Sequence, residues 1–150
     1  MHKIFITGGC GFIGSHLTEF LFNKYKNSLI YVYDKITYAA NKKNLEKIIN
    51  KKTVKIIKDD IINFNSLKKY SKNADLLIHA AAESHVDNSF NDSIQYTYDN
   101  ILGTHNLLEE CRKYRKIVKF IHISTDEVFG DLKDNEFFKE STPYNPSSPY

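Results

Sequence analysis

Short apolar runs alternate along the chain with stretches in which apolar residues recur at helical spacing. Runs of the first kind, bounded by turn residues, indicate buried strands, and the second pattern indicates amphipathic helices. The predicted strands cover residues 2–7, 29–33, 54–58, 75–80 and 117–124. The predicted helices cover residues 12–25, 42–50, 66–72 and 93–114. Prolines and serines predict a loop from Gly130 onward.

This alternation predicts an α/β domain of the Rossmann type, a doubly wound parallel sheet with helices on both faces. At 150 residues, the chain has the length of one domain, residues 1–150. The strand at 117–124 is apolar enough to be buried on both faces, as parallel strands are. His79 and His122 lie within apolar strands, so we expect them in the core or lining a pocket.

The turn after the first strand carries glycines at positions 8, 11 and 14, in the spacing G-x-x-G-x-x-G. Glycines between a strand and a helix permit a tight turn and let the backbone approach a pyrophosphate. The helix that follows would offer free N–H groups and its positive dipole end to the phosphates. The alternative interpretation is a glycine loop with no ligand.

An acidic residue stands at the place where a dinucleotide site requires one. Asp34 ends the second predicted strand, 20 positions after Gly14. A carboxylate at about this distance binds the adenosine ribose hydroxyls, and it would repel a 2′-phosphate. The spacing therefore favours NAD over NADP, although Asp34 could instead be a turn residue at a strand end.

Three further clusters follow the ends of predicted strands, where ligands of such sheets bind. Asp59–Ile61 follows the third strand, and the small residues of Ala80–Asp87 follow the fourth, where they permit a flat ligand or close helix–strand packing. Ser124–Glu127 offers two hydroxyls and two carboxyls, which suit divided acid and base roles but also suit a capped turn. No set of ligands has metal-site spacing, so we predict no metal.

Composition narrows the classes of partner. The net charge is only +3, and the lysines do not alternate with aromatic residues, which argues against nucleic-acid binding. No apolar run reaches the ~20 residues that span a bilayer. Cys10 and Cys111 lie far apart, and the first strand begins almost at the N-terminus, so we expect no signal peptide and a reducing, cytoplasmic location.

Several longer motifs carry a family resemblance over the whole chain. They are TGGCGFIGSH, YDKITYA, DDI, HAAAESHVDNS, NILGTHNLLE, HISTDEVFGDL and PSSPY. With these motifs the chain resembles the extended short-chain dehydrogenases/reductases, and most closely the nucleotide-sugar 4,6-dehydratases of the dTDP-glucose type. The most specific motif is Ser124–Val128, because related epimerases and decarboxylases typically lack an acid at position 126 and enzymes that invert C5 usually have Lys at position 127.

The resemblance implies a redox-neutral lyase that uses NAD and converts dTDP-D-glucose to its 4-keto-6-deoxy derivative. Tyr150 would take the proton of the sugar 4-hydroxyl, Thr125 would hydrogen-bond that oxygen, Glu127 would remove the C5 proton and Asp126 would protonate the departing 6-hydroxyl. Ser84 and Thr125 would contact the substrate. The implied cofactor-binding residues are Gly8, Gly11, Phe12, Ile13, Gly14, Asp34, Lys35, Ile36, Thr37, Asp60, Ile61, Ala80, Ala81, Ala82, Glu83 and Ser84.

Some positions depart from the family pattern, namely Cys10, Asn88, Asp99 and Phe129. In the family a lysine, the last sheet strands and a substrate domain follow the position of Tyr150. We therefore expect this chain to correspond to the N-terminal part of such an enzyme, to form much of an NAD site and to be inactive alone. The family resemblance also implies a homodimer through the helix at 93–114. The alternatives are the same reaction on UDP-glucose, a related epimerase or decarboxylase, and a non-catalytic NAD-binding module.

Overall fold

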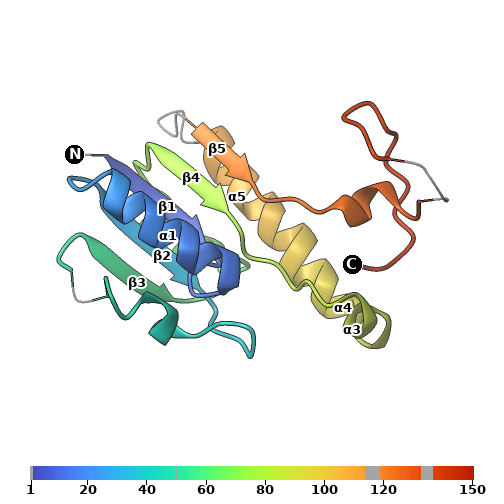
Figure 1. Ribbon diagram of the computed structural model, residues 1–150, viewed down its shortest axis with the longest axis horizontal. Coiled ribbons are helices and arrows are strands. Elements are labelled where there is room, and N and C mark those ends of the chain that lie inside the picture. The colour runs from blue at the N-terminus through green and yellow to red at the C-terminus, as the bar shows by residue number, and fades with distance from the viewer. Residues whose placement is uncertain (1, 50, 114–118, 133–136) are drawn as a thin grey trace.

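The computed structural model describes residues 2–49, 51–113, 119–132 and 137–150. Its centre is one parallel sheet with the strand order β3-β2-β1-β4-β5 (Figure 1). The strands are β1 (Lys3–Thr7), β2 (Leu29–Asp34), β3 (Val54–Lys58), β4 (Leu76–His79) and β5 (Lys119–His122). The chain runs outward from β1 to β3 and then returns to the other side of β1. This reversal makes the gap between β1 and β4 the switch point at which such sheets bind ligands, and it confirms the predicted fold.

Helices lie on both faces of the sheet. They are α1 (Phe12–Lys24), α2 (Phe64–Ser71), α3 (Val86–Asn91), α4 (Ser93–Tyr96) and α5 (Gly103–Lys113). A π-helical segment, η2 (Thr97–Leu102), joins α4 to α5, and two short 3₁₀ helices are η1 (Lys42–Leu45) and η3 (Asp126–Phe129). The strand arrowheads in Figure 1 all point toward the same edge of the sheet, and the loops that leave this edge build the site described below.

The sheet separates two apolar cores. Because successive strand residues point to opposite faces, Ile4 and Ile6 pack on one side and Phe5 packs on the other. The first core receives Leu21 from α1, and the second receives Leu107 from α5. Both faces of the central strands are therefore covered, which explains why their sequences are almost continuously apolar.

The helix predicted at 42–50 is wrong in kind. The described part of this segment forms only the 3₁₀ helix η1 followed by turns, and position 50 lies outside the described residues. Its asparagines are used elsewhere, since the Asn41 backbone N–H and the Asn44 side-chain amide both donate to the Cys10 carbonyl, at 3.0 and 2.9 Å. The Asn41 side chain also accepts the Lys43 N–H at 2.9 Å, and such a local bond competes with a regular helix. The two bonds to Cys10 fasten the segment to the glycine turn.

The single helix predicted at 93–114 is also corrected. Helical structure begins earlier, with α3, and the later part is divided by the π-helical segment; position 114 lies outside the described residues. The buried face carries Gly103, Asn106 and Leu107, while Ile101 and Leu108 are exposed. The small residue and the amide let α5 approach the loop after β3, where Asn106 Nδ2 donates to the Ile61 carbonyl at 3.1 Å.

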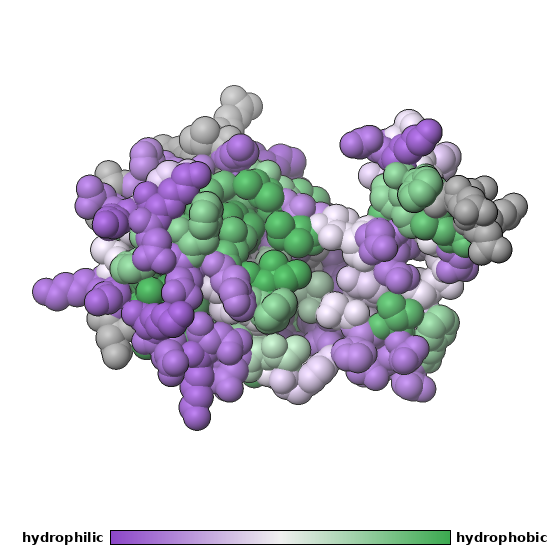
Figure 2. Space-filling view, viewed as in Figure 1, coloured by the Kyte–Doolittle hydropathy of each residue, from purple (hydrophilic) through white to green (hydrophobic). Residues whose placement is uncertain are grey.

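The predicted burial of the last strand on both faces is wrong. Lys119 and His122 are exposed, and the residues between them are half-buried, because in the described part of the chain β5 pairs with β4 alone. Positions 117 and 118 lie outside the described residues. His122 is therefore not in the core, whereas His79 is 1% exposed, as expected. Figure 2 shows hydrophobic residues gathered in the middle of this face, near β4 and β5.

The segment after β5 leaves the sheet and then turns back. It forms η3, which the sequence did not predict, and then the predicted loop from Gly130, as far as it is described. The Asn145 N–H donates to the Val128 carbonyl at 3.0 Å, and the chain ends beside α4 (Figure 1). None of the helices in the described ranges is long and apolar enough to cross a bilayer.

Candidate functional site

A pocket lies at the carboxyl edge of the sheet, over the switch point between β1 and β4. It is built by four loops that follow β1, β2, β3 and β4, with one residue from the π-helical segment. The predicted site residues that line it are Gly8, Gly11, Asp34, Lys35, Thr37, Asp60, Ile61, Ala80, Ala81, Ala82 and Glu83. Tyr33, Ala39, Ala40, Asp59 and Asp99 also line it and were not predicted as site residues.

The glycine turn forms one wall of this pocket. Gly8 has φ +68°, and a Cβ there would lie 2.5 Å from the Ala80 carbonyl oxygen, so a side chain would push the loops after β1 and β4 apart. Gly11 lines the pocket and precedes α1, and no side chain of the described residues caps this helix end. The first N–H groups of α1 therefore remain free to bind an anion.

Asp34 connects the glycine turn to the loop after β2. Its carboxylate accepts the Cys10 N–H at 2.8 Å and the Ile36 N–H at 2.7 Å, and the residue is 6% exposed. Ile36 adopts φ +59°, which is unusual for a β-branched residue and is compatible with this second hydrogen bond. Each carboxylate oxygen keeps a lone pair with which it could accept a ribose hydroxyl.

Charged side chains meet on the wall beneath the loop after β3. Lys35 Nζ lies 2.8 Å from Asp60 Oδ2 and 3.3 Å from Asp99 Oδ1. Burial alone would lower the pKa of Lys35, but the hydrogen bonds and charges of Asp60 and Asp99 outweigh burial and raise it. The position of Asp99 in the pocket follows from the path of the π-helical segment, which the sequence pattern does not reveal.

A chain of hydrogen bonds positions the loop after β4. His79 Nδ1 lies 2.7 Å from Thr7 Oγ1, and its Nε2 lies 2.9 Å from Thr104 Oγ1. Thr104 donates its own hydrogen to the Asn100 carbonyl at 2.6 Å, so it must accept from His79 Nε2–H, and Thr7 must donate to Nδ1. The Asn100 side chain exchanges two 2.9 Å hydrogen bonds with the Glu83 backbone, which fixes the loop against η2.

Asp126 and Glu127, the predicted acid and base of the elimination, lie on η3, and Thr125 caps this helix; none of the three lines the pocket. Thr125 Oγ1 accepts the Glu127 N–H at 3.2 Å and thereby begins this helix, while its hydroxyl lies 3.4 Å from Asp126 Oδ1. The cap that the sequence left as an alternative is thus present. Asp126 is exposed, and Thr125 and Glu127 are half-buried, so all three remain accessible to a ligand.

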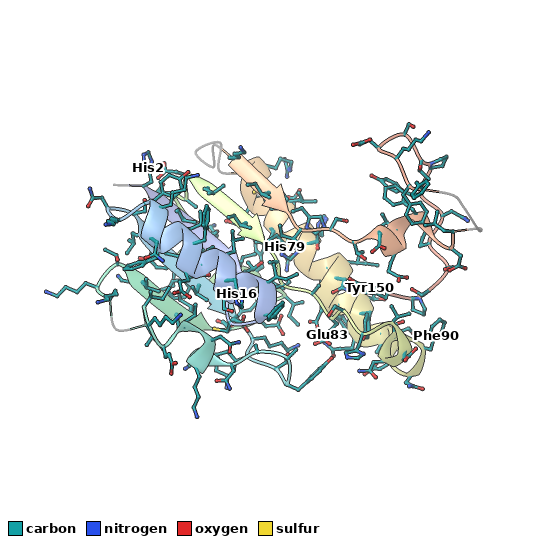
Figure 3. The ribbon with its side chains drawn as sticks, viewed as in Figure 1. His2, His16, His79, Glu83, Phe90 and Tyr150 are labelled. Atoms are coloured by element: carbon teal, nitrogen blue, oxygen red, sulfur yellow. The ribbon has the colours of Figure 1, made fainter. Side chains whose placement is uncertain are left out.

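Tyr150 is half-buried and packs edge-to-face on Tyr96, with ring centroids 6.2 Å apart. Tyr96 in turn donates to the His85 carbonyl at 2.5 Å, so Tyr150 stands over the start of α3. Figure 3 shows Tyr150 in the same region as Glu83, next to the loop after β4. The end of the described chain is therefore brought to the predicted nicotinamide side of the pocket.

The remaining predicted cofactor residues, Phe12, Ile13, Gly14, Ile36 and Ser84, lie beside the pocket and do not line it. Phe12 and Ile13 begin α1 with side chains 78% and 58% exposed, so any contact with a pyrophosphate would come from their backbone. Gly14 is buried under the turn, and Ser84 is exposed near the start of α3. Their predicted roles stay predictions.

No group of three or more potential metal ligands gathers anywhere in the residues that the structure describes. Both cysteines are free, and Cys10 is buried behind the glycine turn. Burial, followed by the charge of Asp34, raises the pKa of the Cys10 thiol to about 12. This thiol therefore stays protonated and acts as a small core side chain.

Comparison with known proteins extends over the whole chain. The family model described as GDP-mannose 4,6 dehydratase matches residues 5–150. A dTDP-D-glucose 4,6-dehydratase of Dictyostelium discoideum is 44% identical over 100% of this chain and 37% of its own length. The chain thus spans less than half the length of the curated relatives it matches.

Solved structures agree with the sequence comparison. A dTDP-glucose 4,6-dehydratase from Streptomyces venezuelae, solved with NAD bound, matches with a TM-score of 0.90 and 35% identity over 99% of this chain and 47% of its own. A UDP-Glc/GlcNAc 4-epimerase from Campylobacter jejuni matches with a TM-score of 0.88 and 28% identity over 100% of this chain and 45% of its own. The chain belongs to the GDP-mannose 4,6 dehydratase family.

Proposed function

We propose that this chain carries the NAD site and the acid–base residues of a nucleotide-sugar 4,6-dehydratase that acts on dTDP-D-glucose. The single observation that carries the proposal is one pocket that combines a glycine turn with the buried carboxylate of Asp34, beside the uncapped N-terminus of α1. These groups match a pyrophosphate followed by a ribose. NAD bound in the Streptomyces venezuelae relative supports the choice of cofactor.

The pocket fits a dinucleotide on its own evidence. Gly11 presents no side chain, and a Cβ built on it would meet only the Gly8 carbonyl at 3.4 Å, which leaves room for phosphate oxygens. Asp34 and Asp60 would hold the adenosine half, and Ala80 to Ser84 would lie along the nicotinamide half. When bound, NAD would supply the oxidant that takes hydride from sugar C4 and returns it to C6.

The residues of the chain would move the protons. Tyr150 would accept the proton of the 4-hydroxyl while the Thr125 hydroxyl hydrogen-bonds the same oxygen. The resulting 4-ketone acidifies the C5 proton, which Glu127 would remove, and Asp126 would donate a proton to the 6-hydroxyl as it leaves as water. The adjacency of the two carboxyls on η3, with Thr125 bonded to both residues, supports this division of roles.

Turnover tests this function directly. The purified protein, in the longest form that can be produced, is incubated with dTDP-glucose or UDP-glucose without added NAD, and products are identified by mass spectrometry and NMR. We expect a 4-keto-6-deoxy product, lighter by one water, from dTDP-glucose. If only UDP-glucose gave product, the substrate would be the uridine nucleotide instead of the thymidine nucleotide. A C4 epimer would favour the epimerase alternative. Bound NAD with no product from any form would favour a non-catalytic module.

We also infer a homodimer, supported by exposed apolar side chains along one helical stretch. Ile94, Tyr98, Ile101 and Leu108 are 63, 48, 66 and 48% exposed, respectively, on α4, η2 and α5. Apolar side chains gathered on one exposed helical face are typical of protein–protein contacts.

A cytoplasmic location is likewise proposed, and it is supported by the two free thiols.

A further inference from the structure

Lys35 is held between two carboxylates that come from different parts of the fold. Asp60 follows β3, and Asp99 belongs to η2, so the ion pairs of 2.8 and 3.3 Å join three segments around one ammonium group. Asp99 is 7% exposed and is itself positioned by the Gln95 side-chain amide, which donates to Asp99 Oδ2 at 2.6 Å. The clasp of Lys35, Asp60 and Asp99 therefore joins a half-buried carboxylate, Asp60, to a buried one, Asp99, which the Gln95 amide holds in place.

Lys35 occupies a sensitive place in the pocket. It follows Asp34 directly, and it is the only cation among the described residues that line the pocket. Sites of this kind select NAD with a carboxylate that binds the ribose 2′-hydroxyl, or NADP with a nearby cation that binds the 2′-phosphate. Asp34 is thus a carboxylate of the kind that selects NAD, and Lys35 next to it is a cation of the kind that binds a 2′-phosphate. An unpaired ammonium group on Lys35 would attract NADP and so oppose the preference for NAD that Asp34 provides.

The carboxylate of Asp34 is also partly occupied. It accepts two backbone N–H groups, from Cys10 and Ile36, and these donors compensate part of its negative charge. Repulsion of a 2′-phosphate by Asp34 alone is correspondingly weakened. A second interaction that neutralises the charge of Lys35 would restore the preference for NAD over NADP.

We propose that Asp99 is a cofactor-specificity residue, which completes the clasp on Lys35 and so denies a 2′-phosphate its cationic partner. The proposal rests on the NAD site proposed above. Asp60 alone would leave the ammonium with one ion pair and with freedom to turn toward the ribose. With Asp99 in place, the Lys35 ammonium group forms ion pairs with two carboxylates, which hold it along the pocket wall. Asp99 needs no contact with the cofactor to have this effect.

The test compares the binding of NAD and NADP to the purified protein by isothermal titration calorimetry. In Asp99→Asn the side chain keeps an oxygen for the Gln95 amide and loses the charge that holds Lys35. We expect the preference for NAD over NADP to fall about tenfold, which corresponds to about 1.4 kcal/mol, through tighter NADP binding with NAD binding little changed. Gln95→Ala, which removes the group that positions Asp99, should shift the preference in the same direction and serves if Asp99→Asn does not fold.

The matched control is Asp59→Asn. Asp59 lines the same pocket, but its carboxylate accepts the Asp60 N–H and the Asn63 side-chain amide, whereas Lys35 forms its ion pairs with Asp60 and Asp99. This variant removes the same charge from the pocket while leaving the clasp intact, so its preference should change much less. The double variant Lys35→Met/Asp99→Asn has no ammonium group to bind a 2′-phosphate, so its preference for NAD should return to about the wild-type level.

The outcomes separate the two levels of inference. If the wild-type protein binds NAD and Asp99→Asn keeps its preference, or if Asp59→Asn shifts as much, the specificity role is overturned while the proposed function stands. A double variant that still accepts NADP would likewise overturn it, because Lys35 would not be the group responsible. Failure of the wild-type protein to bind NAD at all would overturn both.

Discussion

His79 should make the folded state sensitive to mild acid. His79 is 1% exposed and lies between β1 and α5, and burial, followed by the charge of His122, lowers its pKa from 6.5 to about 3. His122 stacks on it with ring centroids 5.0 Å apart. Both ring nitrogens are engaged by threonine hydroxyls, and Thr7 donates to Nδ1, so a proton added there would face a donor rather than an acceptor.

The sign and size of the effect follow from linkage. The folded-state pKa lies below the unfolded value, so the contribution to stability is complete above pH 6.5 and is lost as the pH falls toward 3. At pH 5 the unfolded chain binds this proton and the folded chain does not. The interval of about 1.5 units below the unfolded pKa, at about 1.4 kcal/mol per unit, gives a loss of about 2 kcal/mol from this group.

Urea unfolding at pH 7.5 and pH 5.0 measures this loss, and a variant isolates it from other titrating groups. His79→Gln should be less stable than the wild type at the higher pH, yet its free energy of unfolding should fall about 2 kcal/mol less between the two conditions. His16→Gln, which removes an exposed ring on α1, should keep the wild-type difference. If His79→Gln lost as much stability in acid as the wild type, the buried neutral imidazole would not be the cause.

Three further predictions concern the site and the surface. Gly8→Ala should lower the free energy of unfolding by about 1–3 kcal/mol, measured by urea unfolding, and abolish NAD binding in calorimetry, because the new Cβ meets the Ala80 backbone at 2.5–2.6 Å at a positive φ. Asp126→Asn and Glu127→Gln should each lose the elimination step while keeping C4 oxidation, seen as NADH absorbance with the 4-keto sugar but without its 4-keto-6-deoxy product; formation of the 4-keto-6-deoxy product at the wild-type rate would refute their roles. Ile101→Glu should shift the mass in light scattering from dimer to monomer, whereas Phe20→Glu, at a residue that is also exposed but lies on α1, should not.

The sequence was sufficient for the fold because the central strands are dominated by one pattern. Phe5 and Ile6 of β1 are buried on opposite faces, and Leu77 and Ile78 of β4 behave in the same way, so the alternation of elements determines the centre of the sheet. The glycine spacing and Asp34 also identified the pocket, since both depend on backbone geometry at a fixed distance along the chain. These signals are short-range in the sequence, so they can be recognised without knowing how distant segments pack.

What the sequence did not predict depends on contacts between distant segments. The helix expected at 42–50 is replaced because Asn41 and Asn44 bond to Cys10, over 30 positions away in the chain. The burial expected for β5 requires a neighbour on each side, and the pattern of one strand does not report how many neighbours it has. Asp99 reaches the pocket through a helical irregularity that apolar periodicity cannot register.

That irregularity, η2, explains how one helical stretch serves the pocket and the exposed surface together. A π turn holds more residues than an α turn, and such turns are frequent at functional sites. Here Asp99 lines the pocket and binds Lys35, Asn100 binds the Glu83 backbone, and Ile101 next to them is exposed. Asp99 in the pocket and Ile101 on the surface are only two positions apart. A partner that covers Ile101 therefore also contacts the segment that holds Lys35. Dimer formation and cofactor preference should therefore be measured in the same samples, since a change in one through η2 would appear in the other.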